Sequence, residues 1–249
     1  MTTLLYGTRR NMKHLDLFSG IGGFALAAQW AGIETVALCE IDKFCHKVLQ
    51  KNFPRVPIHD DIRTLRGEDY AGIDIITGGY PCQPFSLAGK RKGSDDERHL
   101  WPEMFRLVRE IKPRWVVGEN VAGHITSGLD DVCDDLESEN YETRTFVFPA
   151  FAVGAKHGRE RVFVVANSKS KRRNYGHDCE NERKADRTEY PSANYSGAFG
   201  RMETGRWAPE PNVGRVVDGV PNRVDRNRGL GNAVVPQVAY EILRCIRAV

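Results

Sequence analysis

The sequence predicts an α/β fold built on a doubly wound, Rossmann-like sheet, and two observations support this class. Short runs of β-forming apolar residues alternate with helix-like stretches between residues 13 and 166. That alternation is typical of a sheet with helices on both faces. The chain has 249 residues, of which 41% are hydrophobic, so it can bury one large core with a small appendage.

The individual elements follow from local patterns. The expected strands cover residues 14–18, 35–40, 73–79, 114–120 and 161–166, and the expected helices cover 24–32, 42–53, 99–111 and 129–138. Gly32 is suited to ending the first helix, and Asp42 to capping the start of the second. The alternation stops at Asn167, which marks the end of the first part of the chain.

The remainder of the chain divides into two further parts. Residues 167–228 are rich in Asn, Gly, Arg, Ser and Pro and show no strong period, which predicts a small irregular region. Residues 229–249 regain order, with apolar positions at 234, 235, 238, 239, 242 and 246 on one helix face. Pro236 is compatible with this helix only near its first turn. We therefore expect boundaries near residues 166 and 228.

Charge, cysteine usage and hydropathy limit the function classes. Residues 168–230 contain 13 Lys and Arg against 9 Asp and Glu, while the whole chain has a net charge of +3. This asymmetry is compatible with a polyanionic partner and equally with a solvated surface. The six scattered cysteines predict neither a disulfide framework nor a zinc site. No apolar run reaches 18 residues and no signal peptide is recognisable, so we expect a cytoplasmic protein without membrane association.

A glycine-rich turn is the first candidate binding element. The stretch "DLFSGIGGFA" (16–25) ends a strand and opens a helix, and Gly20, Gly22 and Ala25 match the pattern G-x-G-x-x-G/A. Glu40, at the end of the next strand, is suited to binding ribose hydroxyls. The motif fits a dinucleotide and S-adenosylmethionine equally, because both carry a ribose. The alternative is a tight turn without a ligand.

Polar residues recur where the predicted strands end. Gly20, Glu40, Asp61, Cys82 and Glu119 each follow a strand-like run. In an open α/β sheet these positions meet at the carboxyl edge, where ligands bind. Alone, each of these residues would more often have a structural role. The pair Asp60–Asp61, for example, is typical of a surface turn. Their coincidence at one edge predicts a single site.

Three residue types at this edge suggest chemistry. Cys82 lies in "GGYPCQPFS", where flanking prolines and glycines favour a stiff loop, and a thiolate there is a candidate nucleophile. Glu119 ends an apolar strand, so burial would raise its pKa and let it donate a proton. Arg159 and Arg161 open a strand and are suited to binding a phosphate or an oxygen acceptor; an ion pair with Glu160 is the alternative.

These motifs together resemble those of the DNA (cytosine-5) methyltransferase family. "DLFSGIGGF", "GGYPCQPFS", "ENV", "RERVFVVA" and "LGNAVVPQVA" occur in the family's order and span most of residues 14–166 and 229–249. The resemblance implies S-adenosylmethionine as the cofactor and double-stranded DNA as the substrate of a monomeric enzyme, as in restriction-modification systems. It assigns residues 167–228 to a short target-recognition region. His157 departs from the glutamine that the family's arginine motif usually carries.

The resemblance also implies roles for particular residues. The catalytic residues would be Cys82, Glu119, Arg159 and Arg161. The cofactor would contact Phe18, Ser19, Gly20, Gly22, Gly23, Glu40, Ile41, Asp61, Ile62, Pro81, Asn232 and Val234. In the implied reaction, Cys82 forms a covalent bond to carbon 6 of a cytosine that is flipped out of the duplex, and carbon 5 is then methylated. Residues 86–99 would close over the flipped base.

Three alternatives compete with this hypothesis. An RNA cytosine-5 methyltransferase would use the same chemistry, although Ser86 stands where a tRNA-modifying branch typically has threonine. An NAD-dependent oxidoreductase would explain "GIGGFA" and Glu40 but not Cys82 or Glu119. A catalytically silent DNA-binding relative is the third, and the presence of the candidate catalytic residues counts against it.

Overall fold

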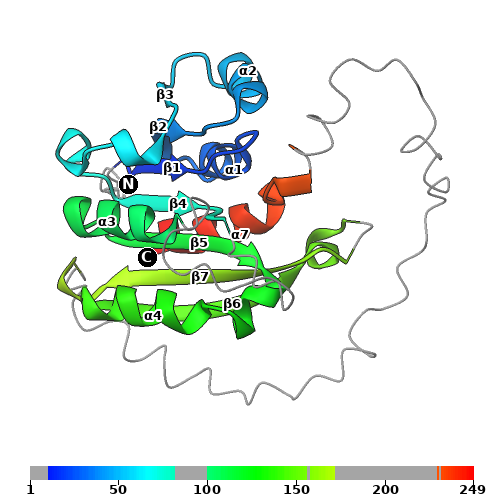
Figure 1. Cartoon of the computed structure of the whole chain (residues 1–249). Coiled ribbons are helices and arrows are strands. Elements are labelled where there is room, and N and C mark those ends of the chain that lie inside the picture. Colours follow the sequence, from blue (N-terminus) through cyan, green and yellow to red (C-terminus); the bar gives the residue numbers. More distant parts are fainter. Residues whose placement is uncertain (1–10, 82–99, 156–157, 172–228, 230) are drawn as a thin grey trace, which may run out of the picture. The chain divides into compact units, whose positions relative to one another are not determined.

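The computed structural model describes residues 11–81, 100–155, 158–171, 229 and 231–249, and all statements below concern these residues. Seven strands form one sheet in the order β3-β2-β1-β4-β5-β7-β6 (Figure 1). The strands are β1 (Lys13–Leu17), β2 (Glu34–Cys39), β3 (Ile58–His59), β4 (Ile75–Gly78), β5 (Trp115–Val121), β6 (Tyr141–Pro149) and β7 (Glu160–Ser168). The helices are α1 (Gly23–Trp30), α2 (Lys43–Asn52), α3 (Trp101–Ile111), α4 (Leu129–Ser138) and α7 (Pro236–Ala248).

The predicted α/β sheet is confirmed. The structure shows in addition that the sheet is mixed, with both parallel and antiparallel strands. Strands β1 to β5 pair in parallel, whereas β7 runs antiparallel to both β5 and β6. The antiparallel direction places the first residues of β7 beside the last residues of β5, with Arg161 opposite Val121. The two arginines at the start of β7 therefore reach the carboxyl edge of the parallel strands.

Local signals explain where most helices begin and end. The Asp42 side chain accepts hydrogen bonds from the amides of Phe44 and Cys45 and so caps α2, as predicted. Helix α1 ends one residue before Ala31, and Gly32 follows with a φ of 67°. Helix α7 begins at Pro236, a position that needs no amide hydrogen, so the expected placement of this proline is confirmed.

Two expectations about the C-terminal and edge elements need correction. The apolar positions at 234 and 235 precede α7 and do not belong to its helical face. Strand β6 was not expected from the sequence, because residues 144–147 in its centre mix Arg and Thr with Phe and Val. The structure shows that these four residues are exposed. This composition reflects its position at the edge of the sheet.

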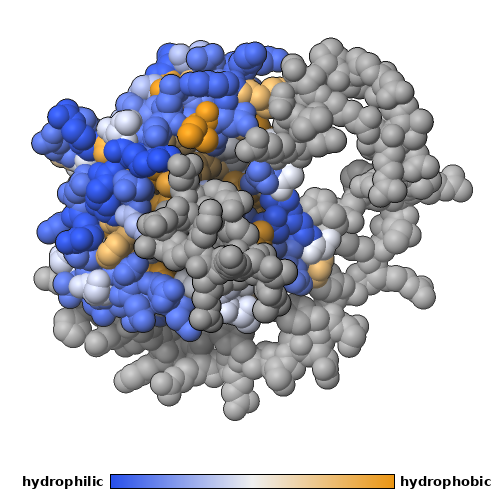
Figure 2. Space-filling model, viewed as in Figure 1, coloured by the Kyte–Doolittle hydropathy of each residue, from blue (hydrophilic) through white to orange (hydrophobic). Residues whose placement is uncertain are grey.

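The core consists of two layers of apolar side chains, one on each face of the sheet. Helices α3 and α4 pack on one face, where Leu15, Ile76 and Val116 meet Met104 and Leu136. Helices α1 and α7 pack on the other, over a cluster that includes Ile75, Val117 and Phe163. Figure 2 shows that the outer surface over α3 and α4 is mostly hydrophilic. The helices thus bury their apolar stripes against the sheet and leave its carboxyl edge open.

Most of residues 167–228 lies outside the described residues, so the division of the chain at residues 166 and 228 stays a prediction. Strand β7 continues to Ser168 and is followed by a short 3-10 helix at Lys169–Lys171. Among the described residues, no helix is both long and apolar enough to cross a membrane.

Candidate active site

A cavity of about 380 Å³ lies at the carboxyl edge of the sheet. Its lining includes nine residues predicted for the site: Phe18, Gly20, Glu40, Ile41, Pro81, Glu119, Arg159, Arg161 and Asn232. They come from the ends of β1, β2, β4 and β5, the start of β7 and the segment before α7. The volume falls within the usual range for ligand pockets, about 300–1,000 Å³. Candidate cofactor residues and candidate catalytic residues therefore share one cavity.

Glu40 is held by the backbone amides of two other residues that line the cavity. Its Oε2 accepts a hydrogen bond from the amide of Gly20 at 2.7 Å, and its Oε1 accepts one from the amide of Asp42 at 2.8 Å. A carboxylate has about four acceptor positions, so two remain for further donors. Glu40 is thus oriented by the glycine-rich turn and can still accept hydroxyl groups such as those of a ribose.

The turn after β1 has an unusual backbone conformation. Phe18 has a φ of 54°, which is rare for a bulky residue, and Gly20 also has a φ of 54°. A non-glycine residue in this region costs about 1–3 kcal/mol, and such strain is concentrated at binding sites. Phe18 lines the cavity, so the strained conformation points to a role in ligand binding.

Four other residues predicted for the cofactor lie outside the lining of this cavity: Ser19, Gly22, Gly23 and Val234. Gly23 packs against the segment before α7, because a Cβ there would lie 2.5 Å from Cγ1 of Val234 and 2.9 Å from its carbonyl oxygen. At Gly22, φ is 91° and a Cβ would lie 2.6 Å from the ring of Phe53. These two glycines allow close packing around the turn.

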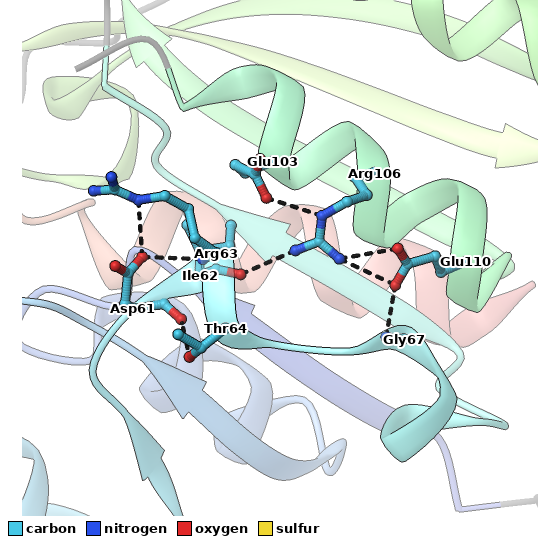
Figure 3. A network of polar contacts seen from close by, with 8 residues as sticks. All are labelled: Asp61, Ile62, Arg63, Thr64, Gly67, Glu103, Arg106 and Glu110. Carbon is cyan, nitrogen blue, oxygen red and sulfur yellow. Dashed lines mark hydrogen bonds and ion pairs between the residues drawn. The ribbon is translucent and has the colours of Figure 1, made fainter. Parts of the chain in front are cut away.

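Asp61 and Ile62 also lie outside the cavity lining, in a loop fixed by a polar network (Figure 3). Oδ1 of Asp61 accepts hydrogen bonds from the amide and the Nε of Arg63, at 3.0 and 3.2 Å. Arg106 of α3 donates to the carbonyl of Ile62 at 3.1 Å and pairs with Glu110 at 2.9 Å. The network holds this loop at the end of β3, where the sequence placed it.

The side chains of Glu119 and Arg161 form an ion pair at the back of the cavity. Nε of Arg161 lies 3.0 Å from Oε1 of Glu119, and both side chains are largely buried. The two residues are diagonal neighbours on one face of β5 and β7, since Arg161 is opposite Val121. The contact lacks the alignment of a hydrogen bond, so Oε1 of Glu119 has no hydrogen-bond partner among the described residues.

Burial raises the pKa of Glu119 above its ordinary value, although Arg161 and Arg159 act in the opposite direction. The residue is only 6% exposed, so desolvation of the carboxylate outweighs the attraction of the arginines. Gly79, which follows the neighbouring strand β4, is also close, because a Cβ there would lie 3.3 Å from Oε2 of Glu119. Glu119 is therefore suited to donating a proton to a group that enters the cavity.

Arg159 connects the start of β7 to the segment that precedes α7. Its guanidinium donates to the carbonyl oxygens of Gly231 and Ala233, at 2.5 and 3.0 Å. Burial and the proximity of Arg161 lower its pKa. The arginine thus holds residues 231–233 against the cavity, where Asn232 contributes to the lining. Within the described part of the chain, neither arginine forms the alternative ion pair with Glu160, since Arg161 pairs with Glu119 and Arg159 donates to two backbone carbonyls.

Three residues near the cavity were not singled out from the sequence. Asn120 donates through Nδ2 to the carbonyl of Tyr80 at 3.1 Å. The hydroxyl of Tyr80 lies 3.0 Å from Nε2 of His124, and the tyrosine ring also packs on Trp101. These contacts fix the residue that precedes Pro81. The only feature of the sequence that could have indicated these residues was the polar Asn120 beside Glu119, at the end of an apolar strand.

Several predicted functional residues lie outside the described residues. They are Cys82, the loop at residues 86–99 with Ser86, and His157. The described chain reaches Pro81, which lines the cavity.

Comparison with known proteins decides the family. The model of the C-5 cytosine-specific DNA methylase family matches residues 12–215, which is most of the chain. The chain belongs to this family. The family assignment made from the ordered motifs is therefore confirmed.

Curated relatives in the methylase family are bacterial type II methyltransferases. The chain is 46% identical over 157 residues to M.NgoMIV of Neisseria gonorrhoeae, covering 61% of this chain and 50% of the relative. It is 36% identical over 159 residues to M.HhaI of Haemophilus parahaemolyticus, covering 62% of this chain and 48% of the relative. The chain thus spans about half the length of the curated relatives it matches.

Two solved structures share the fold. A DNMT2 mutant from Spodoptera frugiperda superposes with a TM-score of 0.57 at 25% identity, covering 68% of this chain and 54% of that one. A protein assigned as a DNA modification methyltransferase of an E. coli prophage gives a TM-score of 0.55 at 32% identity, covering 64% and 47%. Both superpositions support the predicted methyltransferase sheet.

Proposed function

We propose that this chain transfers a methyl group from S-adenosylmethionine to carbon 5 of a cytosine in double-stranded DNA. Family membership supports the reaction class, and the type II relatives support a role in modification of DNA. The observation that carries the proposal is the shared cavity. It joins Glu40 and the glycine-rich turn to the Glu119–Arg161 pair at one edge of the sheet.

The residues present fit S-adenosylmethionine. Glu40 retains acceptor capacity for the two ribose hydroxyls, and it is fixed by Gly20 and Asp42. The strained Phe18 and the segment that contains Asn232 line the same cavity. Asp61, in the loop after β3 and outside the cavity lining, is the candidate partner for the adenine amino group. When bound, the cofactor supplies the electrophilic methyl group that carbon 5 of the cytosine accepts.

The chain's own residues prepare the base for this transfer. The thiolate of Cys82 adds to carbon 6 of the cytosine, and the electron pair of the ring double bond becomes available at carbon 5. Glu119, whose pKa is raised by burial, donates a proton to N3 as charge develops there. Arg161 binds the ring oxygen. After carbon 5 has been methylated, its proton passes to solvent water and the N3 proton returns to Glu119, which reforms the ring double bond and releases the Cys82 thiolate.

The base must leave the DNA stack to reach the cavity, because a ring inside a duplex is inaccessible to Cys82 and Glu119. Extrusion costs a few kcal/mol, which contacts made by the protein must offset. We assign the loop at residues 86–99 to closure over the extruded base and residues 167–228 to recognition of the target sequence. The loop and most of residues 167–228 lie outside the described residues, and both assignments rest on the order of the family motifs. The cell compartment would be the cytoplasm, and the active species a monomer.

The proposal is tested by replacing the nucleophile and scoring methylation. The chain and its Cys82→Ser variant are expressed in a host that lacks cytosine methylation, and 5-methylcytosine is mapped by bisulfite sequencing. Cys245→Ser is the matched control, because Cys245 is exposed on α7 and absent from the cavity. Methylation should occur at one sequence context, persist in the control and vanish in Cys82→Ser.

Two further measurements separate the alternatives. Purified protein is assayed side by side on duplex DNA and on tRNA, and methylation confined to tRNA would replace DNA as the substrate. Thermal unfolding is followed with S-adenosylmethionine and with NAD. Stabilisation by NAD alone would favour an oxidoreductase, and near-full methyl transfer by Cys82→Ser would refute the covalent mechanism.

A further inference from the structure

The loop that follows β3 is joined to helix α3 by side chains that have no part in the proposed reaction. The loop contains two short 3-10 turns, Ile62–Thr64 and Gly67–Tyr70. Asp61 immediately precedes the first turn and caps it, because its Oδ1 accepts a hydrogen bond from the amide of Arg63 at 3.0 Å. The position of Asp61 therefore depends on how this first turn is held against the rest of the fold.

Arg106 of α3 holds the first turn at the residue next to Asp61. Its Nη2 donates a hydrogen bond to the carbonyl oxygen of Ile62 at 3.1 Å. The same guanidinium donates through Nε to Glu103 at 2.9 Å, and through Nη1 to both carboxylate oxygens of Glu110 at 2.9 and 3.1 Å. Figure 3 shows the guanidinium between the two glutamates and facing the loop. All three of its nitrogens are engaged, so its orientation toward Ile62 is fixed.

Glu110 of α3 holds the second turn of the same loop. Its Oε2 accepts a hydrogen bond from the amide of Gly67 at 2.7 Å. The backbone comes so close that a Cβ at Gly67 would lie 2.3 Å from the Cβ of Glu110. Between these two polar contacts, Ile62 and Leu65 are buried in the core cluster that includes Met104 of α3. One helix therefore fixes both turns of the loop.

The charged side chains of α3 act at a distance from the cavity. Its lining includes none of Glu103, Arg106 and Glu110. Their ion pairs are partly exposed, and isolated pairs of this kind add little to stability. Four hydrogen bonds on one guanidinium have a different effect, because they fix the geometry of every group that they join. This arrangement is suited to orienting the loop more than to stabilising the fold.

We propose that Arg106, together with Glu110, is a positioning residue that sets the loop so that Asp61 recognises the amino group of the cofactor's adenine. This inference rests on the proposed cofactor. Oδ1 of Asp61 is already bonded to Arg63, so Oδ2 is the oxygen left for the amino group. Ile62 directly follows Asp61, and release of its carbonyl from Arg106 would displace this acceptor. Discrimination between an amino group and a carbonyl oxygen on the purine therefore depends on α3.

The test compares S-adenosylhomocysteine with S-inosylhomocysteine, which carries a carbonyl oxygen in place of the purine amino group. Calorimetric titration measures the Kd of each for the full chain. A carboxylate that accepts from the amino group repels the carbonyl oxygen, so the unaltered chain should prefer the adenosine compound by about tenfold or more. Arg106→Met removes all four hydrogen bonds and should reduce this preference to about threefold or less, mainly by weakening the adenosine compound. Arg109→Met is the matched control on the same helix, because Arg109 pairs with Glu139 at the end of α4, and it should keep the preference.

Further variants separate positioning from a general loosening of the fold. In an Asp61→Ala background, adding Arg106→Met should change the preference by less than about twofold, because the arginine acts through Asp61. Glu110→Gln keeps an acceptor for the amide of Gly67 but loses the charge that orients Arg106, so its preference should be intermediate. Thermal unfolding without ligand checks that each variant is folded.

The outcomes separate this inference from the proposed function. If the unaltered chain binds the adenosine compound and Arg106→Met keeps the full preference, the inference alone is wrong. An equal loss in Arg109→Met, or a further loss in the Asp61→Ala background, also overturns it. If the unaltered chain binds neither compound, the proposed cofactor is wrong and the inference fails with it.

Discussion

Glu119 and Arg161 lie 3.0 Å apart although 42 positions separate them in the sequence, because antiparallel pairing of β5 and β7 makes them diagonal neighbours. The pair keeps a buried carboxyl group at the cavity wall without giving its Oε1 a hydrogen bond. A buried carboxyl group with a raised pKa, such as that of Glu119, is suited to taking up and releasing a proton during a reaction.

Replacing Glu119 by Gln should reduce methyl transfer by about 10²–10⁴-fold, the range expected for loss of a general acid. The amide keeps the size of the side chain, so the affinity for S-adenosylmethionine should change little. Single-turnover kinetics on duplex DNA measures the effect. Glu160→Gln, an exposed change on β7, is the control and should retain activity. A Glu119→Gln rate within threefold of the unaltered chain would contradict the proton-donor role.

The pH dependence of the chemical step should follow the same carboxyl group. Burial raises the pKa of Glu119, and the protonated form is the donor, so the single-turnover rate should fall as pH rises through that raised pKa. The fall should be absent from the residual rate of Glu119→Gln. A descending limb that is identical in both proteins would assign the pH dependence to another group.

Local sequence patterns were sufficient to predict the parts of the site that depend on neighbours in the chain. Gly20, Glu40 and the Asp42 cap follow from a strand, a tight turn and a helix start, each read within a few residues. The parallel strands then bring their ends together by topology alone. This is why Gly20, Glu40 and Glu119 were expected at one edge before any contact was known.

The remaining features depend on contacts between distant segments. Strand β6 lies at the sheet edge with an exposed centre, so it lacks the apolar alternation of a half-buried strand. The contact between Tyr80 and His124 joins residues 44 positions apart, and neither residue type is unusual in its local context.

The Tyr80–His124 contact should position the chain that leads to Cys82. Tyr80→Phe removes one buried hydrogen bond, which contributes about 0.5–1.5 kcal/mol to stability, and keeps the packing on Trp101. We expect kcat for methyl transfer to fall severalfold while the Kd of S-adenosylmethionine stays within twofold. Steady-state kinetics and calorimetric titration measure these quantities. A change in cofactor affinity with unchanged kcat would argue against a positioning role.

Asp16 should make folding stability depend on pH. It is fully buried, and burial raises its pKa to about 7, whereas the unfolded value is 3.8. The folded state therefore holds a proton that the unfolded state has lost, and this stabilisation is present below pH 4 and disappears as pH rises toward 7. Relative to Asp16→Asn, the unaltered chain should lose about 4 kcal/mol of stability across this interval. Urea unfolding at several pH values measures the difference, and a pH-independent difference would show that Asp16 is ionised throughout.

The packing of Gly23 against Val234 should be essential for stability. A Cβ at residue 23 would lie 2.5 Å from Cγ1 of Val234 and 2.9 Å from its carbonyl oxygen, so α1 and the segment before α7 would have to separate. Gly23→Ala should therefore destabilise the chain by about 1–3 kcal/mol, as is typical of an overpacked core. Gly123→Ala is the matched control, because no atom lies within 4 Å of a Cβ there and its φ is not positive. Adding Val234→Ala should recover part of the loss, since the side-chain contact disappears while the carbonyl contact remains. Urea unfolding decides the matter: equal stability of the two alanine variants would mean that the segment before α7 does not pack on α1 as tightly as these distances require.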